Sequence, residues 1–163
     1  MREVSPITCL GTLVTVKAHD DSVHHQVAQR LHGSGLKYTA GRRQLVDLLL
    51  QHGRPASVPE LLKKRPRLTQ SSMYRNLADL EQIEIIHKVS GTDDHARYEL
   101  TEEFIGHHHH LICVRCGDID DFVVTASTER ALDGALVQAA RAAKFTVSGH
   151  RLDALGLCAR CKR

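Results

Sequence analysis

The sequence has no apolar run near the roughly 18 residues that a membrane-spanning helix needs, so we expect no membrane contact. Its first residues, Met1-Arg-Glu-Val-Ser-Pro, lack the charged-then-apolar pattern of a signal peptide, although residues 7–16 are mildly apolar, and we expect a cytoplasmic protein. A His-Glu-x-x-His helix and a convincing pair of nucleophile and base are also missing. A zinc-dependent hydrolase remains an alternative without a motif behind it, and we expect a protein that is not an enzyme.

The composition is ordinary but the charge is unevenly distributed. The 163 residues, 42% hydrophobic and 25% charged, suffice for one medium domain or two small ones. The net charge of +3 conceals a window over residues 30–75 with ten basic and only two acidic residues. Such a window is a candidate surface for a polyanion such as nucleic acid, although charged helices are often only solvated faces.

Cysteine is scarce, but four of the five cysteines form two pairs. The pairs are Cys113-Val-Arg-Cys116 and Cys158-Ala-Arg-Cys161, and together they offer the four sulfurs of a tetrahedral zinc site. The interval between them exceeds the roughly 15 to 20 residues of a zinc ribbon, so a strand, a helix and a strand must fit between them. Two disulfides or a redox motif are the alternative, disfavoured in a reducing compartment. We expect Cys9 to be a free thiol.

The first two thirds of the chain predict a helical unit followed by a hairpin. Residues 1–19 show no clear period and predict a loosely attached arm. Four segments with apolar residues at helical spacing follow. They begin near Asp20, at the caps Thr39 and Thr69, and at Ser57, whose capping box includes Glu60. Residues 85–89 and 97–100 then have strand character, with turn residues at 91–94.

Helices followed by a hairpin are the outline of a winged helix, in which the last helix lies in the major groove of DNA. The start of that helix carries Ser71 and Ser72, whose short polar side chains suit phosphates or base edges, and then Tyr74 and Arg75. Packing of Tyr74 in the core is the alternative.

Past Thr101 the pattern changes to a small α/β unit. Residues 111–113, 119–124 and 145–152 predict strands, and residues 126–143 predict an Ala-rich helix. This layer is too small to bury both of its faces alone, so we expect a homodimer. The fold class is α+β: an N-terminal winged-helix DNA-binding domain joined by a hinge to an α/β dimerisation domain. We expect an arm at 1–19, the winged helix at 20–100, the hinge at 101–106 and the metal-binding dimerisation domain at 107–163.

The run His107-His-His-His110 leads into a predicted strand, where successive side chains point to opposite faces. His107 and His109 therefore face one way and His108 and His110 the other, so that one tract can serve two metal ions. His150, with either Asp133 or Glu129, could complete a site on the first side; Glu99 and Asp121 are the acids nearest in sequence on the second. Imidazole and carboxylate ligands suit Fe(II), Mn(II), Zn(II) or Ni(II). A solvated surface tract or an expression tag is the alternative, although the internal position argues against a tag.

These residues together resemble the ferric uptake regulator family of metal-responsive repressors, from about Gly35 to Cys161. The resemblance rests on the order and spacing of short motifs: Gly35-Leu-Lys-Tyr-Thr39, Arg42-Arg43, Ser72-Met-Tyr-Arg-Asn-Leu77, Arg97-Tyr-Glu-Leu100, His107 to Gly117, Gly149-His-Arg-Leu152 and Gly156-Leu-Cys-Ala-Arg-Cys161.

The resemblance implies a homodimeric repressor that binds palindromic operators in double-stranded DNA when it is loaded with metal. It implies a structural Zn(II) on the four cysteines and a regulatory divalent ion in the hinge. It also implies a second ion in the dimerisation domain, and a Lys37 directed toward the minor groove beside Tyr74 and Arg75. The implied hinge ligands are Glu99, His108, His110 and Asp121, and those of the second site are His107, His109, His150 and an acid, for which the count back from His150 favours Asp133.

Three departures from the family pattern leave details open. Pro55 stands where the family commonly has a hinge histidine, so His52, His87 or His95 must substitute or the site has one ligand fewer. The segment from 122 to 150 is a few residues longer than is typical, which keeps Glu129 open beside Asp133.

Thr101 stands near where zinc-specific members place a cysteine, which favours Fe(II) or Mn(II) over Zn(II) as the sensed ion. A zinc- or manganese-responsive member and a peroxide-sensing repressor of the same family are alternatives within it, the latter because many iron sensors carry Glu where this chain has Asp121. A purely structural zinc-ribbon interaction module is the alternative outside it.

Overall fold

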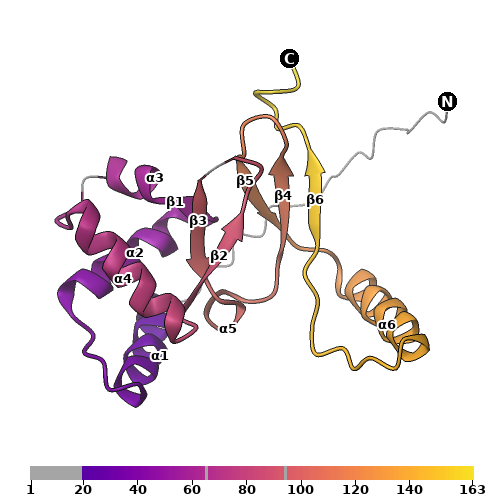
Figure 1. Ribbon diagram of the computed structural model, residues 1–163, viewed down its shortest axis with the longest axis horizontal. Helices are drawn as coiled ribbons and strands as arrows, with labels where there is room; N and C mark the ends of the chain where they lie inside the picture. Colours follow the sequence, from indigo (N-terminus) through magenta and orange to yellow (C-terminus); the bar gives the residue numbers. More distant parts are fainter. Residues whose placement is uncertain (1–19, 65, 94) are drawn as a thin grey trace.

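The computed structural model describes residues 20–64, 66–93 and 95–163 (Figure 1). The predicted arm at 1–19, with Cys9, lies outside the described residues. Four helices come first: α1 (Asp20–Gly33), α2 (Ala40–His52), α3 (Val58–Lys63) and α4 (Gln70–Gln82).

The predicted helix caps are present. Thr39 and Thr69 accept hydrogen bonds from backbone amides of the first turns of α2 and α4. Ser57 and Glu60 form the reciprocal capping box of α3. Gly53 ends α2 at φ 69°, a left-handed conformation that costs glycine little. Local sequence therefore sets where these helices begin and end.

A three-stranded sheet completes this half in the order β1-β3-β2, all antiparallel. Its strands are β1 (Ala56–Ser57), which the sequence did not predict, β2 (Ile86–Ser90) and β3 (Ala96–Leu100). The helices and this sheet share one core, whose fully buried members include Leu31, Leu45, Met73, Leu80 and Ile85. Helices that lead into a β2–β3 hairpin form the expected winged helix.

The predicted hinge contains a short helix, α5 (Glu102–Ile105). Phe104 on α5 is 5% exposed and packs in the core of the winged helix, so the hinge is anchored to that half. Gly106 then leaves the helix at φ 86°, where other residues would be strained.

The second half is a three-stranded sheet in the order β5-β4-β6, with helix α6 (Ala126–Ala142) between β5 and β6 in the chain. The central strand β4 (His109–Cys113) runs antiparallel to β5 (Ile119–Phe122) and parallel to β6 (Asp153–Gly156). In Figure 1, α6 stands away from the sheet, and none of its residues is buried.

The strand predicted at 145–152 is wrong, because the chain joins β4 only at Asp153. Phe145 stays 69% exposed, and the segment instead carries His150 to the carboxylate of Glu129 on α6. Alternating apolar residues indicate that one side of a segment can be buried, but they do not say which residues will find a pairing partner.

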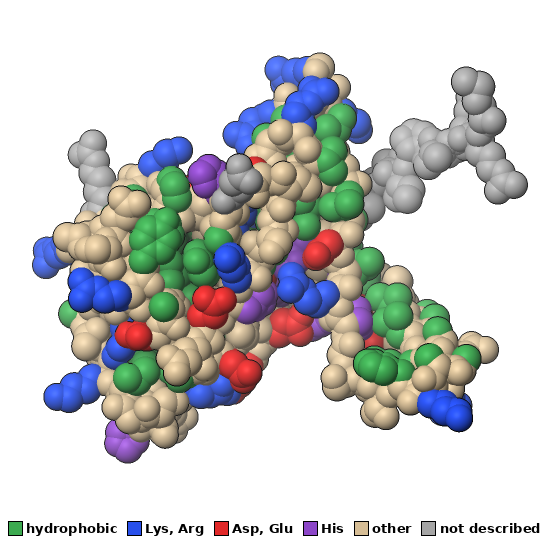
Figure 2. Space-filling model, in the orientation of Figure 1, with side chains coloured by type: hydrophobic (Ala, Val, Ile, Leu, Met, Phe, Trp, Pro, Cys, Tyr) green, Lys and Arg blue, Asp and Glu red, His purple; other side chains and the backbone are tan. Residues whose placement is uncertain are grey.

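The surface of the second half is unusually apolar. Of the large hydrophobic side chains exposed in the described residues, all but Tyr74 lie between Leu111 and Leu157. In Figure 2, hydrophobic side chains cover much of the visible face of α6. None of the helices in the described part of the chain has the length and hydrophobicity that a bilayer crossing requires.

Candidate metal centres and nucleic-acid interface

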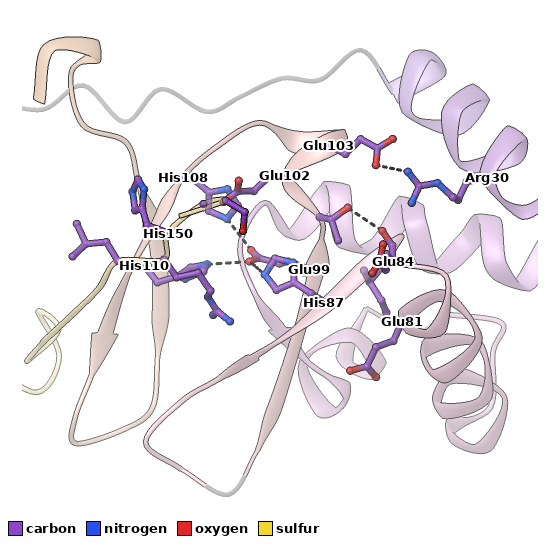
Figure 3. Close-up of a pocket in the computed structure, with 16 residues that line it drawn as sticks. Arg30, Glu81, Glu84, His87, Glu99, Glu102, Glu103, His108, His110 and His150 are labelled. Atoms are coloured by element: carbon purple, nitrogen blue, oxygen red, sulfur yellow. Dashed lines mark hydrogen bonds and ion pairs between the residues drawn. The ribbon is translucent and has the colours of Figure 1, made fainter. Parts of the chain in front are cut away.

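The first histidine cluster lies between the two halves of the molecule. It consists of Glu99 from β3, His108 just before β4, His110 in β4, and Asp121 from β5, with ligand atoms within 4.8 Å of one another. Glu99 Oε1 lies 3.0 Å from His110 Nε2, and Glu99 Oε2 lies 3.2 Å from His108 Nε2. Figure 3 shows His108 and His110 directed toward Glu99. All four residues expected in the hinge thus lie in one cluster, and alternation along the histidine block turns His108 and His110 toward it.

Burial and mutual charge shape the titration of this cluster. Burial alone would raise the pKa of Glu99, but hydrogen bonds with His108, His110 and His87 outweigh it and hold that pKa well below its usual range. The hydrogen bond to Glu99 raises the pKa of His108 to about 9. Burial, and then the charge of Glu99, raises the pKa of Asp121 to about 6. Asp121 Oδ1 is buried without a hydrogen-bond partner, so the cluster has an acceptor to spare for a cation.

Of the three histidines that could replace a ligand at Pro55, His87 is the one that contacts the cluster. It lies opposite Glu99 in the β2–β3 register, and its Nε2 is 2.8 Å from Glu99 Oε1. His52 lies instead among the charges of Arg54 and Glu60, where burial and then Arg54 lower its pKa.

The hinge cluster opens into a cleft of ≈ 770 Å³ between the two halves. In Figure 2, acidic, basic and histidine side chains meet at this junction, and the cleft lining includes Arg30 and Arg151. The cleft is lined on the helical side by acids that include Glu81, Glu84 and Glu102, and on the other by His150. Because five glutamates outnumber the two arginines in the lining, the cleft suits the approach of a cation.

The second histidine cluster lies on the opposite side of the histidine block, against α6. It brings together His107, His109, His150 and Glu129, with ligand atoms within 4.8 Å of one another. Glu129 contacts His107 and His109 at 3.2 and 3.1 Å. Glu129 Oε1 and His150 Nε2 lie 3.0 Å apart, yet neither makes a hydrogen bond. Atoms so placed are better suited to share a cation than a proton.

Asp133, the acid favoured from sequence, lies at the edge of this cluster. Its Oδ1 is 3.2 Å from His150 Nδ1, the ring nitrogen that faces away from Glu129, and its side chain is 57% exposed against 23% for Glu129. Two further contacts were not foreseen: Asp153 lies 3.1 Å from His110 Nδ1, and Glu102 lies 2.9 Å from His107 Nδ1. The Asp153 contact follows from the parallel β4–β6 register, which sequence alone did not reveal.

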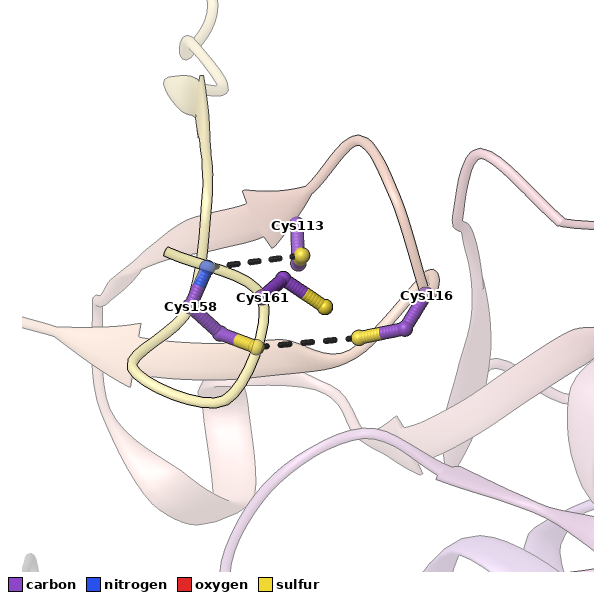
Figure 4. Close-up of side chains that lie close together, drawn as sticks. All are labelled: Cys113, Cys116, Cys158 and Cys161. Carbon is purple, nitrogen blue, oxygen red and sulfur yellow. Dashed lines mark hydrogen bonds between the residues drawn. The ribbon is translucent and has the colours of Figure 1, made fainter. Parts of the chain in front are cut away.

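The four paired cysteines converge at one end of the second sheet (Figure 4). None is in a disulfide, and Cys116 Sγ lies 3.7 Å from Cys158 Sγ. Sulfurs bound at about 2.3 Å to one tetrahedral zinc ion would be about 3.8 Å apart, whereas a disulfide needs about 2.05 Å. Backbone hydrogen bonds, first that from the amide of Cys158, lower the pKa of Cys113 to about 6. The set therefore fits zinc.

The candidate nucleic-acid interface lies at the start of α4. Tyr74 is 48% exposed and so is not a core residue, and Arg75 beside it is also exposed. Lys37 is exposed as well, and its carbonyl accepts a hydrogen bond from Arg42, which pairs with Asp79 of α4 at 2.6 Å. Arg42 thus ties the Lys37 loop to α4, a role that sequence reasoning did not assign.

Comparisons with known proteins identify the family of this chain. The model of the Ferric uptake regulator family matches residues 33–154. The ferric uptake regulation protein of Bacillus subtilis is 32% identical over 142 residues, which cover 83% of this chain and 92% of that protein. The peroxide-responsive repressor PerR of Staphylococcus epidermidis is 26% identical, with 90% of this chain and 97% of that protein covered.

Solved structures show the same fold. That of the Helicobacter pylori ferric uptake regulator, which has three functional metal binding sites, superposes with a TM-score of 0.68 at 24% identity, covering 88% of this chain and 94% of that one. The Vibrio cholerae regulator superposes with a TM-score of 0.63 at 25% identity, covering 80% and 98%. The chain therefore belongs to the ferric uptake regulator family of metal-responsive repressors.

Proposed function

We propose that this protein is a homodimeric cytoplasmic repressor that binds a palindromic operator in double-stranded DNA when the hinge cluster holds a divalent ion, with Fe(II) favoured. The observation that carries the proposal is the origin of the hinge ligands. Glu99 belongs to the winged helix, whereas His108, His110 and Asp121 belong to the second half of the protein, and their ligand atoms converge within 4.8 Å. An ion held there links the two halves.

The ion acts by differential affinity. Without it, the winged helix samples several orientations relative to the second sheet; with it, α4 is held at the angle and spacing that two half-sites require. Coupling of about 1 to 3 kcal/mol would change operator affinity about 5- to 150-fold, and DNA would tighten the hinge ion by the same factor.

Each protomer would hold three ions with separate roles. Zinc on the four cysteines is structural, and the hinge ion is the sensor, with His87 as a further ligand in place of the one absent at Pro55. The cluster of His107, His109, His150 and Glu129 would hold the third ion and link α6 to β4. The three metal sites of the Helicobacter pylori protein support this count.

A homodimer is supported by the apolar side chains that the second half leaves exposed, among them Leu155 at 67% and Val114 at 50%. A two-fold dimer would cover such a face and would present two recognition helices to the two halves of a palindrome.

The hinge ligands bear on which ion is sensed. The hinge offers imidazole and carboxylate atoms, and Thr101, close to where a thiolate would favour zinc, donates its hydroxyl to the carbonyl of Glu84 instead. We would titrate a palindromic promoter fragment with protein under anaerobic conditions, adding Fe(II), Mn(II) or Zn(II) in turn and measuring bound metal. We expect the tightest binding to the promoter fragment with Fe(II). Binding that is the same with and without each of the three ions would favour a structural zinc module instead.

Peroxide sensing is the second candidate, supported by Asp121 in the hinge and by the similarity to PerR. In that case Fe(II) would promote oxidation of a ligating histidine and release of DNA. Mass spectrometry of the iron form after peroxide treatment should then find one added oxygen atom on His108 or His110. If neither His108 nor His110 is oxidised, peroxide sensing is excluded and metal sensing remains as the proposed function.

Replacing Arg75 with alanine should weaken operator binding even when metal is saturating. Arg75 is exposed at the start of α4, where a guanidinium can reach a phosphate or a base edge. A loss of about 1 to 3 kcal/mol is expected if it reads a base; if it contacts a phosphate, the loss would be similar across sequences and the salt slope would fall by about 1. Lys162→Ala, at an exposed cation beyond the last cysteine, is the control, and an unchanged Arg75→Ala protein would contradict the interface.

Glu129→Ala should remove one metal equivalent per protomer, whereas Asp133→Ala should keep it at lower affinity. Glu129 contacts all three histidines of the second cluster, but Asp133 contacts only the outward Nδ1 of His150. Loss of such an outer partner typically costs about 10- to 100-fold in metal affinity. Metal content after gel filtration, with calorimetric titration of each variant, measures the difference. The reverse order of effects would restore Asp133 as the ligand.

A further inference from the structure

The two halves of the protein touch at a second place, apart from the hinge cluster. There the tip of the β2–β3 hairpin lies against the turn that carries Cys113 and Cys116. Thr92 Oγ1 donates a 3.0 Å hydrogen bond to the carbonyl of Cys113. Val89 at the end of the hairpin is fully buried against Ile112 and Ile119 of the second sheet. The hairpin is therefore docked on the cysteine turn.

The approach of the two segments is close at two glycines. A Cβ added at Gly91 of the hairpin would lie 3.3 Å from the carbonyl of Gly117, and one added at Gly117 would lie 2.3 Å from the Asp93 carboxylate carbon. Asp93 is itself held by two hydrogen bonds from Arg97, at 2.6 and 2.9 Å. A side chain at Gly91 or Gly117 would have to displace the side chain of Asp93, so the two segments approach closely here.

An ion pair crosses the same junction beside the hairpin. Arg54, between the end of α2 and β1, donates from Nη1 to Asp118 Oδ1 and to the carbonyl of Ile119, both at 2.7 Å. Both charged side chains are less than a third exposed, at 29% and 26%. A charge-assisted bond that also satisfies a backbone carbonyl fixes a geometry better than a solvated surface pair does. On its other oxygen, Asp118 accepts from Arg160 at 3.0 Å, a contact within the second half.

These contacts lie outside the hinge cluster. None of the side chains that make them belongs to the hinge cluster, and Arg54 stands directly before Pro55, the position that supplies no ligand here. The loop before α3 is thus attached to the second half by an arginine and a carboxylate.

We propose that Arg54 and Asp118 are positioning residues, and that with the docked hairpin they form an anchor that does not require the hinge ion and that holds the winged helix on the four-cysteine turn. The inference rests on the proposed function, because it concerns how recognition helix α4 is oriented for DNA. The anchor sets part of this orientation before the hinge ion binds. The hinge ion then completes an arrangement that is already partly formed, so fewer orientations must be removed when it binds.

The test compares variants of the full-length, zinc-loaded protein. In Arg54→Ala without the hinge ion, amide hydrogen exchange should rise in residues 86–93 of the hairpin and in residues 117–119. With metal saturating, operator affinity should fall about 5-fold or more, within the usual range of coupling between sites. Arg160→Ala, which removes the other partner of Asp118, is the matched control and should leave both quantities unchanged.

Two further variants separate positioning from folding. Arg54→Lys should retain part of the effect, and the exchanged pair of Arg54→Asp with Asp118→Arg should restore slow exchange and operator affinity. The anchor would be overturned if Arg54→Ala kept the amide hydrogen exchange and operator affinity of the wild type. It would also be overturned if the double variant, Arg54→Asp with Asp118→Arg, were no better in these two quantities than either single variant. If the wild-type protein showed no metal-dependent DNA binding while exchange still rose in Arg54→Ala, the proposed function would fail and the anchor would stand.

Discussion

Serine in place of Cys113 is expected to release the zinc ion and to unfold or monomerise the second half of the protein. Cys113 is the last residue of the central strand β4 and is 3% exposed, and its sulfur accepts a hydrogen bond from the amide of Cys158 beyond β6. A zinc ion on the four sulfurs would therefore join the ends of two paired strands. Zinc binding contributes about 10–16 kcal/mol to the folding of zinc-finger peptides, so loss of a ligand is severe.

Zinc content, light scattering after gel filtration and thermal melting would measure this outcome. Cys9→Ser makes the same chemical change at the cysteine outside the two pairs and should behave as wild type. A Cys113→Ser protein that stays dimeric, with an unchanged melting temperature, would show that the ion is not structural.

Alanine in place of His110 should preserve the fold and abolish metal-induced operator binding. His110 Nε2 lies 3.0 Å from Glu99 Oε1, so this ring connects the second sheet to the winged helix. Glu99 keeps two histidine partners, His87 and His108, which limits the cost of the deletion in the absence of metal. The loss should amount to the whole coupling, about 5- to 150-fold in operator affinity.

The neighbouring residue provides the contrast. His109→Ala removes a ring that faces Glu129 and should lower metal content at the second cluster while a response to the hinge ion remains. His95→Ala, at an exposed site in the β2–β3 turn, should be silent. Operator binding as a function of metal concentration should be measured for the three histidine variants. Normal metal-induced operator binding in His110→Ala would show that the sensing site lies elsewhere.

Local patterns predicted most elements of the fold. The caps at Thr39, Ser57 and Thr69 depend on hydrogen bonds within one turn, so they are readable from sequence. The two-residue strand β1 and the strand β6 depend on partners distant in the chain, and both were missed or misplaced. Tertiary pairing decides such segments, and periodicity carries little information about it.

The histidine clusters show the same limit within a site. Alternation along β4 separates the four histidines between two faces, because the strand period is two residues. The choice between Glu129 and Asp133 could not be made that way. They are four residues apart on α6, on the same face of the helix, and only the course of the chain from α6 to His150 decides which one lies inside the cluster.

Strand β4 and the residues just before it supply ligand atoms to all three clusters, and this bears on how the strand finds its register during folding. A shift of β4 by one residue would turn the even-numbered histidines toward α6 and the odd-numbered ones toward Glu99. Each cluster would still receive two imidazoles, so the histidines alone do not distinguish the two registers. Cys113 does, because the shift would carry its sulfur away from the other three. A zinc ion on the four cysteines, which has no part in the proposed sensing, would thus select the correct register of the sheet.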